Sequence, residues 1–303
     1  MKRTKTKQAS LMAGALLLCA LAAGSQRPSP EGDDTAPYDT IPLKATATTA
    51  LRHSGENVIE DTAQVLRPFF LKLAQKQEPV RVVHVGDSHV RGHIFPLVVR
   101  HLLEEDFGSE AVEDDKITYQ TSGLATETGK PGLVYHILGI NGAEASTFNN
   151  EERAREIAAL KPDLLIVSLG TNEAHARDYR AEEHREQLTS LLKLLKDSCP
   201  SAAILLTTPP GAYPKGRRTP TGNPNTPTVC SVIRDCAARQ GAAVWDLYEI
   251  AGGRTDACRN WTSLRMLKPD GVHFTPDGYT LQAHLLRDAL VKAYNSYARA
   301  GLE

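Results

Sequence analysis

The sequence places a serine, an aspartate and a histidine where together they can perform acyl transfer. Ser88 follows the segment 80–85, in which four of six residues are β-branched valines, and then Gly86, so it lies where a predicted buried strand turns sharply into a predicted helix. Free N–H groups at a helix N-terminus favour negative charge, which suits a nucleophile whose reaction passes through an oxyanion. Asp270 and His273 lie close together near the C-terminus. A nucleophilic serine needs a base and an acid that orients the base, and this pair can supply both.

Two other stretches contain candidate donors for the oxyanion. Gly142 can offer a backbone N–H with no side chain in the way, and Asn172 can offer a side-chain N–H. The N–H of Ser88 is a third candidate. Each residue follows a predicted strand, and an open α/β sheet binds its ligands at the carboxyl ends of its strands. Taken alone, Gly86-Asp87-Ser88 is equally typical of ordinary turn chemistry, and the other stretches favour a site.

Strands alternate with helices along most of the chain. Strands are predicted at 80–85, 133–140, 164–169, 203–208 and 242–247, and helices from near 60, after Ser88 to about 105, at 151–160, through 188–199, from 229 and at 277–300. Thr275 is a suitable N-cap for the last helix. The segments 107–131, 208–228 and 253–268 are expected to be irregular. This alternation predicts a three-layer α/β/α sandwich with a mostly parallel, flavodoxin-like central sheet.

The composition is that of an ordinary globular protein. Hydrophobic residues make up 41% of the 303 residues and charged residues 23%, with a net charge of -1. This balance gives no electrostatic reason to expect nucleic acid or an anionic membrane surface as a partner. We expect one domain over residues 60–303, preceded by a flexible leader at 25–59 that is rich in Pro, Thr, Ala and Asp.

The N-terminal residues 1–24 have the pattern of a signal peptide. Several lysines and an arginine precede the apolar run Leu11–Ala23, which is short for a membrane span, and Ala20-Leu21-Ala22 fits a cleavage site. We therefore expect an exported protein, periplasmic or extracellular, with no membrane span after cleavage. Cys19 invites a lipoprotein interpretation, but Leu18 stands where a small residue is expected. An uncleaved N-terminal anchor is a further alternative.

Neither a metal nor a cofactor is expected. Four cysteines remain after the predicted cleavage: Cys199, Cys230, Cys236 and Cys258. In an exported protein they permit two disulfides in any of three pairings, and the alternative is that they are buried small side chains. Their spacing does not fit zinc. His89 and His93 have a spacing that can bind zinc, but Val90 follows His89 where the common metalloprotease motif has Glu.

In combination, these stretches resemble the SGNH, or GDSL-type, hydrolase superfamily. The matching stretches occur in the family's order: Val85-Gly86-Asp87-Ser88, Gly142, Gly170-Thr171-Asn172 and Asp270-Gly271-Val272-His273. The resemblance covers about residues 60–300. It implies that Ser88 is the nucleophile, that Asp270 and His273 complete the triad, and that Gly142 and Asn172 join the Ser88 N–H as oxyanion donors.

The Gly-Asp-Ser-His form is similar to the branch that contains peptidoglycan O-acetylesterases and related carbohydrate acetylesterases. That likeness implies a serine esterase that removes O-acetyl groups from a glycan through an acetyl-enzyme. His89, Asp87, Glu173 and Asn225 are then candidate substrate-binding residues. Two alternatives are a glycan O-acetyltransferase with the same site and a non-catalytic glycan-binding envelope protein. The oligomeric state stays open.

Overall fold

The computed structural model describes residues 38–43, 50–113, 122–214 and 216–301. The chain divides into two units, Met1–Asp34 and Thr35–Glu303. The first unit, and with it the predicted signal peptide, lies outside the described residues. Everything below concerns the second unit.

A seven-stranded sheet forms the centre of this unit, with the strand order β1-β7-β6-β5-β2-β4-β3. Its strands are β1 (Ile59–Glu60), β2 (Pro79–Gly86), β3 (Ser122–Gly123), β4 (Gly132–Gly139), β5 (Leu164–Ser168), β6 (Ala203–Thr207) and β7 (Ala243–Trp245). The five inner strands run parallel, and the two-residue strands β1 and β3 pair antiparallel at the edges. The predicted mostly parallel sheet is confirmed, and β2, which leads to Ser88, lies within it.

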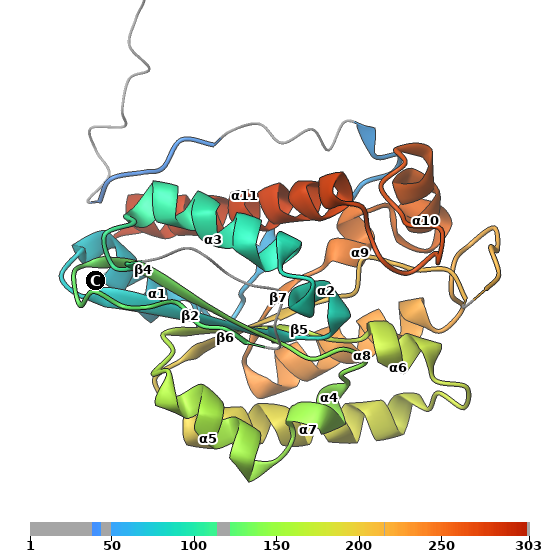
Figure 1. Cartoon of the computed structure of the whole chain (residues 1–303), viewed down its shortest axis with the longest axis horizontal. Coiled ribbons are helices and arrows are strands. Elements are labelled where there is room, and N and C mark those ends of the chain that lie inside the picture. Colours follow the sequence, from blue (N-terminus) through green and yellow to red (C-terminus); the bar gives the residue numbers. More distant parts are fainter. Residues whose placement is uncertain (1–37, 44–49, 114–121, 215, 302–303) are drawn as a thin grey trace, which may run out of the picture. The chain divides into compact units, whose positions relative to one another are not determined.

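Helices cover both faces of the sheet because successive strand side chains point to opposite sides. On β2, Val80 and Val82 pack into the core on one face, and Val83 and Val85 into the core on the other. The first face is covered by α1 (Arg67–Gln75), α3 (Ile94–Phe107) and α11 (Pro276–Ala300), and the second by α5 (Glu151–Ala159), α7 (Ala181–Ser198) and α8 (Thr226–Gln240) (Figure 1). Burial of each such aliphatic side chain stabilises the sandwich by about 1.5–3 kcal/mol. The predicted three-layer architecture is confirmed.

Four short helices lie in the connections between these elements, α2 (Ser88–Arg91), α4 (Ala145–Phe148), α6 (Thr171–His175) and α9 (Leu247–Ile250), and so does the longer α10 (Gly253–Ser263). The prediction that 253–268 is irregular is wrong, because Ala257, Cys258 and Trp261 give one side of α10 a buried apolar face. The helix expected from residue 60 begins only at Arg67. Before it, the Asp61 carboxylate accepts the N–H groups of residues 65 and 66 and holds a turn.

The domain boundary expected at residue 60 is too late in the chain. The backbone N–H and C=O of Ile41 both bond to the side chain of Asn295 on α11, each at 2.8 Å. Asn57 donates to the Leu285 carbonyl at 2.8 Å. The described parts of the expected leader are therefore fixed on the folded unit, because α11 bonds to the backbone of Ile41 and to the side chain of Asn57.

Among the described residues, the four cysteines are all unpaired and buried. The two-disulfide interpretation is therefore wrong for this structure, and the cysteines pack as small apolar side chains. Within the same residues, no three metal-ligating side chains come together, and none of the helices is both long and apolar enough to span a bilayer.

Candidate active site

Ser88 is the first residue of α2, in the turn that follows β2. The Asp87 side chain caps this helix by accepting the N–H of His89 at 2.8 Å. A side chain at Gly86 would place its Cβ 2.6 Å from the Ser168 carbonyl oxygen. Gly86 is therefore required for space and not for a positive φ.

Gly139 gives α2 the same kind of space from the neighbouring strand. A Cβ on Gly139 would lie 2.2 Å from the backbone nitrogen of Arg91. Since real atoms do not approach so closely, the two glycines let α2 pack directly on the ends of β2 and β4. Gly142, in the turn after β4, has φ +75°, a conformation that favours glycine.

Ser88, His273 and Asp270 form a hydrogen-bonded chain, although 185 residues separate the serine from the histidine. Ser88 Oγ lies 2.9 Å from His273 Nε2, and His273 Nδ1 lies 2.8 Å from Asp270 Oδ2. This order places one ring nitrogen at the hydroxyl and the other at the carboxylate. A neutral imidazole that donates to the carboxylate through Nδ1 can accept the hydroxyl proton at Nε2.

The short spacing of Asp270 and His273 lets one carboxylate bond both the backbone and the ring. Asp270 Oδ1 accepts the N–H groups of Val272 and His273, each at 2.9 Å, while Oδ2 faces the ring. Partial burial acts to raise the pKa of Asp270, but the Val272 N–H and the bonds from His273 outweigh it and hold the pKa below its ordinary value. The carboxyl is therefore an anion wherever it is needed to orient the ring.

Tyr213 supports the loop that contains Asp270 and His273, a role that the sequence analysis missed. Its N–H donates to the Gly271 carbonyl at 2.8 Å, and its buried side chain packs against Gly271. The Tyr213 carbonyl lies 2.9 Å from His175 Nε2, which links the loop to α6. The segment 208–228 was expected to be irregular, and the aromatic residue within its Pro/Gly-rich stretch is the signal that could have shown that part of it is buried.

The candidate oxyanion donors lie near Ser88 but are not equally free. Gly142 is exposed, and nothing would lie within 4 Å of a Cβ on it. Asn172 Nδ2 donates to the Ala143 carbonyl at 2.9 Å and to Asp87 Oδ2 at 3.4 Å. The amide therefore ties the Gly142 turn to the Ser88 turn.

Two of the four residues expected to bind substrate are buried beside the serine. Asp87 is 2% exposed, and burial raises its pKa to about 7. His89 is 6% exposed, and burial lowers its pKa to about 3, so the ring is neutral. The His89 ring lies against His273, with 5.4 Å between the ring centroids. Both side chains are buried beneath the Ser88 turn, so neither is exposed to a substrate.

The other two residues, Glu173 and Asn225, also bond to the protein itself. Glu173 is buried, and its two carboxyl oxygens accept the N–H groups of Ala145 at 3.0 Å and Gly170 at 2.9 Å. Asn225 donates to the Ala174 carbonyl at 3.0 Å. The expectation that these side chains contact substrate is not supported, because their polar atoms hold the connections of α4 and α6.

Glu173 gives a prediction about pH and stability. Burial raises its pKa to about 7 against the opposing backbone N–H bonds, so the folded protein binds a proton there that the unfolded chain releases from about pH 4.5. Its stabilisation is thus complete below about pH 4.5 and is lost as the pH rises to about 7. We expect the melting temperature of the wild type, minus that of Glu173→Gln, to fall over this interval. A difference that rises with pH would mean that the N–H bonds dominate.

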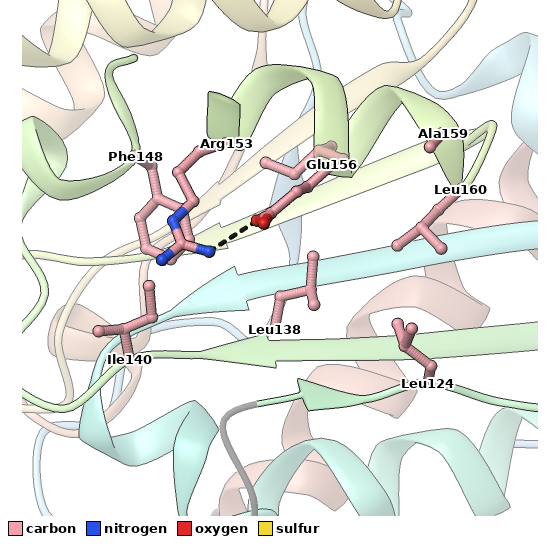
Figure 2. A pocket seen from close by; sticks show the side chains of 9 residues that line it. Leu124, Leu138, Ile140, Phe148, Arg153, Glu156, Ala159 and Leu160 are labelled. Carbon is pink, nitrogen blue, oxygen red and sulfur yellow. Dashed lines mark hydrogen bonds and ion pairs between the residues drawn. The ribbon is translucent and has the colours of Figure 1, made fainter. Parts of the chain in front are cut away.

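A pocket of about 540 Å³ lies at the β3–β4 edge of the sheet and beside α5. Figure 2 shows its apolar side chains, with the Arg153–Glu156 ion pair beside them. None of Ser88, Asp270 and His273 lines it. The pocket is therefore distinct from the candidate site, because the Ser88 hydroxyl lies at the carboxyl end of the inner strand β2.

Fold and site together define a hydrolase of the α/β class with a serine, a histidine and an aspartate in one hydrogen-bonded chain. The sequence matches the model of the GDSL-like lipase/acylhydrolase family over residues 102–281, which is more than half of the chain. The protein belongs to this family, as the SGNH resemblance predicted. Gly142, Asn172, Asp270 and His273 lie within the matched region, and Ser88 precedes it.

Solved structures agree with this assignment at the level of the fold. A peptidoglycan O-acetylesterase superposes with a TM-score of 0.65 and 18% identity, covering 80% of this chain and 99% of its own. An acetyl xylan esterase, AlAXEase, gives a TM-score of 0.50 and 16% identity, covering 68% of this chain and 98% of its own. A comparison with curated proteins finds no match.

Proposed function

We propose that the protein is an exported serine esterase that removes O-acetyl groups from a glycan, either peptidoglycan or another carbohydrate. The observation that supports this proposal most strongly is the hydrogen-bonded chain Ser88–His273–Asp270 at the carboxyl edge of a parallel sheet, in a member of an acylhydrolase family. The predicted signal peptide supports export. The acetyl group and the glycan come from the two solved acetylesterases with this fold.

In the proposed mechanism, Ser88 Oγ attacks the acetyl carbonyl while its proton moves to His273 Nε2. The Asp270 carboxylate keeps Nδ1 protonated and stabilises the imidazolium that forms. When the tetrahedral intermediate collapses, the glycan oxygen leaves with the proton from Nε2. A water molecule, deprotonated by His273 in turn, then releases acetate from the acetyl-enzyme.

The oxyanion is assigned to three donors: the N–H of Ser88, the N–H of Gly142 and the side chain of Asn172. The Ser88 N–H belongs to the first residue of α2, where a helix has no carbonyl of its own to pair it with. Gly142 contributes a backbone N–H from an exposed turn. Asn172 contributes Nδ2 by exchanging its 3.4 Å contact with Asp87 for the oxyanion.

Asn172→Ala is expected to lower kcat by about 10²-fold, since one oxyanion donor commonly contributes about 3 kcal/mol to the barrier. The measurement is the turnover of a small aryl acetate. Asn150→Ala is the matched control, because Asn150 also donates to a backbone carbonyl, at 3.1 Å, but on an exposed turn before α5. Unchanged turnover in the Asn172 variant would remove this side chain from the mechanism.

The experiment that tests the function is acetate release by the purified residues 25–303 from O-acetylated peptidoglycan and from acetylated xylan, beside the Ser88→Ala variant. We expect release that depends on Ser88 and that is faster on one of the two polymers. Release from both polymers at equal rates would keep the esterase and leave its glycan undecided.

Two other outcomes would change the proposal. Cleavage of aryl acetates without release from either polymer would favour another acyl group or an O-acetyltransferase with the same site. No ester cleavage, together with no labelling by a fluorophosphonate probe, would favour the non-catalytic glycan-binding protein. Labelling that is lost in Ser88→Ala would contradict that last alternative, because the probe needs a reactive serine.

A further inference from the structure

A small cavity of about 20 Å³ lies behind the Ser88 turn, at the carboxyl ends of β5, β6 and β7. Its walls are mixed. Phe95 and Trp245 are apolar, whereas Asp87, His89, Thr208 and Gln282 offer polar groups. A space of this size holds a water molecule, and buried water needs two to four polar partners. The cavity therefore has both the room and the chemistry for an internal water.

Two side chains that line this cavity have buried nitrogen atoms in need of a partner. Within the described part of the chain, neither His89 Nε2 nor Gln282 Nε2 has a hydrogen-bond partner. Both residues are almost wholly enclosed, at 6% and 1% exposure. A buried polar atom without a partner costs about 1–3 kcal/mol, so two beside one polar cavity indicate a shared ligand.

The hydrogen-bonding capacity of the His89 ring is consistent with a shared ligand in the cavity. Its Nδ1 lies 3.0 Å from the Tyr279 hydroxyl, which satisfies one ring nitrogen. The ring is buried and neutral, so it carries one N–H and one acceptor, and Nε2 has to meet the other need. Water can donate or accept at Nε2, whereas the Gln282 amide nitrogen can only donate to it.

The position of His89 connects the cavity with the proposed chemistry. Its ring centroid lies 5.4 Å from that of His273 and 5.9 Å from that of Phe274, the next residue. His273 in turn meets Ser88 Oγ at 2.9 Å. A His89 ring fixed at both nitrogens is a rigid wall for the His273 ring, while a ring bonded only to Tyr279 can tilt.

We propose that the cavity is a built hydration site in which one water bridges His89 Nε2 and Gln282 Nε2, and that His89 and Gln282 are thereby positioning residues for His273. Asp87 also lines the cavity. Neither His89 nor Gln282 touches the substrate in this proposal. The positioning role rests on the proposed function; the hydration site does not.

Gln282→Met tests the proposal, because methionine has a similar shape and no N–H. If Nε2 binds a bridging water, we expect the melting temperature to fall by about 2–4 °C. We also expect kcat to fall on the order of tenfold with KM nearly unchanged, as for a misoriented base. If Nε2 has no bridging water, kcat is unchanged in Gln282→Met, and this result would overturn the proposal.

Leu286→Met is the matched control, since it places methionine on the next turn of α11 in a buried apolar setting away from the cavity. A crystal structure that resolves ordered water gives a readout independent of activity. We expect density within hydrogen-bond distance of both nitrogens in the wild type, and its loss in Gln282→Met. A dry cavity would overturn the hydration site even if the variant did not fold.

The outcomes separate this inference from the proposed function. An ordered water with no esterase activity in the wild type would keep the hydration site and reject the function. Ser88-dependent activity with an unchanged kcat in Gln282→Met would keep the function and reject the positioning role. His89→Phe, which keeps a ring against His273 but loses both nitrogens, is expected to show the same kcat loss as Gln282→Met.

Discussion

Ser88→Ala is expected to lower kcat for ester hydrolysis by about 10⁴–10⁶-fold, the range seen when the nucleophile of a serine triad is removed. The alanine variant lacks Ser88 Oγ, which lies 2.9 Å from His273 Nε2 and forms the acetyl-enzyme in the proposed mechanism. Ser88 is half-buried and its hydroxyl is small, so the fold should persist. Initial rates on an aryl acetate, with the melting temperature recorded beside them, measure both effects.

Ser190→Ala is the control for this variant. Ser190 lies on α7, and its hydroxyl donates to Asn149 at an exposed position. Its loss should change neither turnover nor fluorophosphonate labelling. If Ser88→Ala kept even a tenth of the wild-type rate, Ser88 would not be the nucleophile and the proposed mechanism would fail.

Asp270→Asn is expected to lower kcat by about 10⁴-fold through the tautomer of His273. The asparagine oxygen can keep accepting the N–H groups of Val272 and His273, which places the NH₂ group where Oδ2 now lies 2.8 Å from Nδ1. Nδ1 must then accept, so the proton moves to Nε2. A protonated Nε2 cannot take the proton of Ser88.

The exposure of Asp270 allows this explanation to be tested. Its side chain is 49% exposed, so solvent screens its charge, and solvent can replace it as an acceptor for Nδ1–H. Asp270→Ala should therefore retain more activity than Asp270→Asn. The reverse order would mean that the charge of Asp270 matters more than the tautomer. Asp277→Asn, an exposed acid in the first turn of α11, controls for a general change of charge.

The sequence determined the sandwich and the order of its main elements. The strands 80–85 and 164–169 are covered on both faces and are therefore mostly apolar. This apolar pattern lies within each strand, so it can be recognised from the sequence. Thr275 caps the last helix as predicted, its hydroxyl accepting the Gly278 N–H at 3.3 Å. The short elements α4, α6 and β1 were not predicted, because they are too short for a hydrophobic period to appear in the sequence.

The sequence also indicated which residue types could form a site, because each candidate follows a strand of a parallel sheet. The sequence gives the chemical type of each side chain directly. The alternation of strands and helices predicts that the carboxyl ends of the strands lie at one edge of the sheet. It follows that Ser88, Asp270 and His273 could be named without coordinates. The family match supports the assignment of the fold and leaves their roles to the variants above.

Only the tertiary structure decided which polar side chains face the open site and which face the core. Asp87, His89 and Glu173 stand next to Ser88 or Asn172 in sequence, yet all three are buried and bonded within the protein. Tyr213, far from the motifs, supports the Asp270 loop. Burial and the choice of partner depend on contacts between distant segments, and no local pattern contains them.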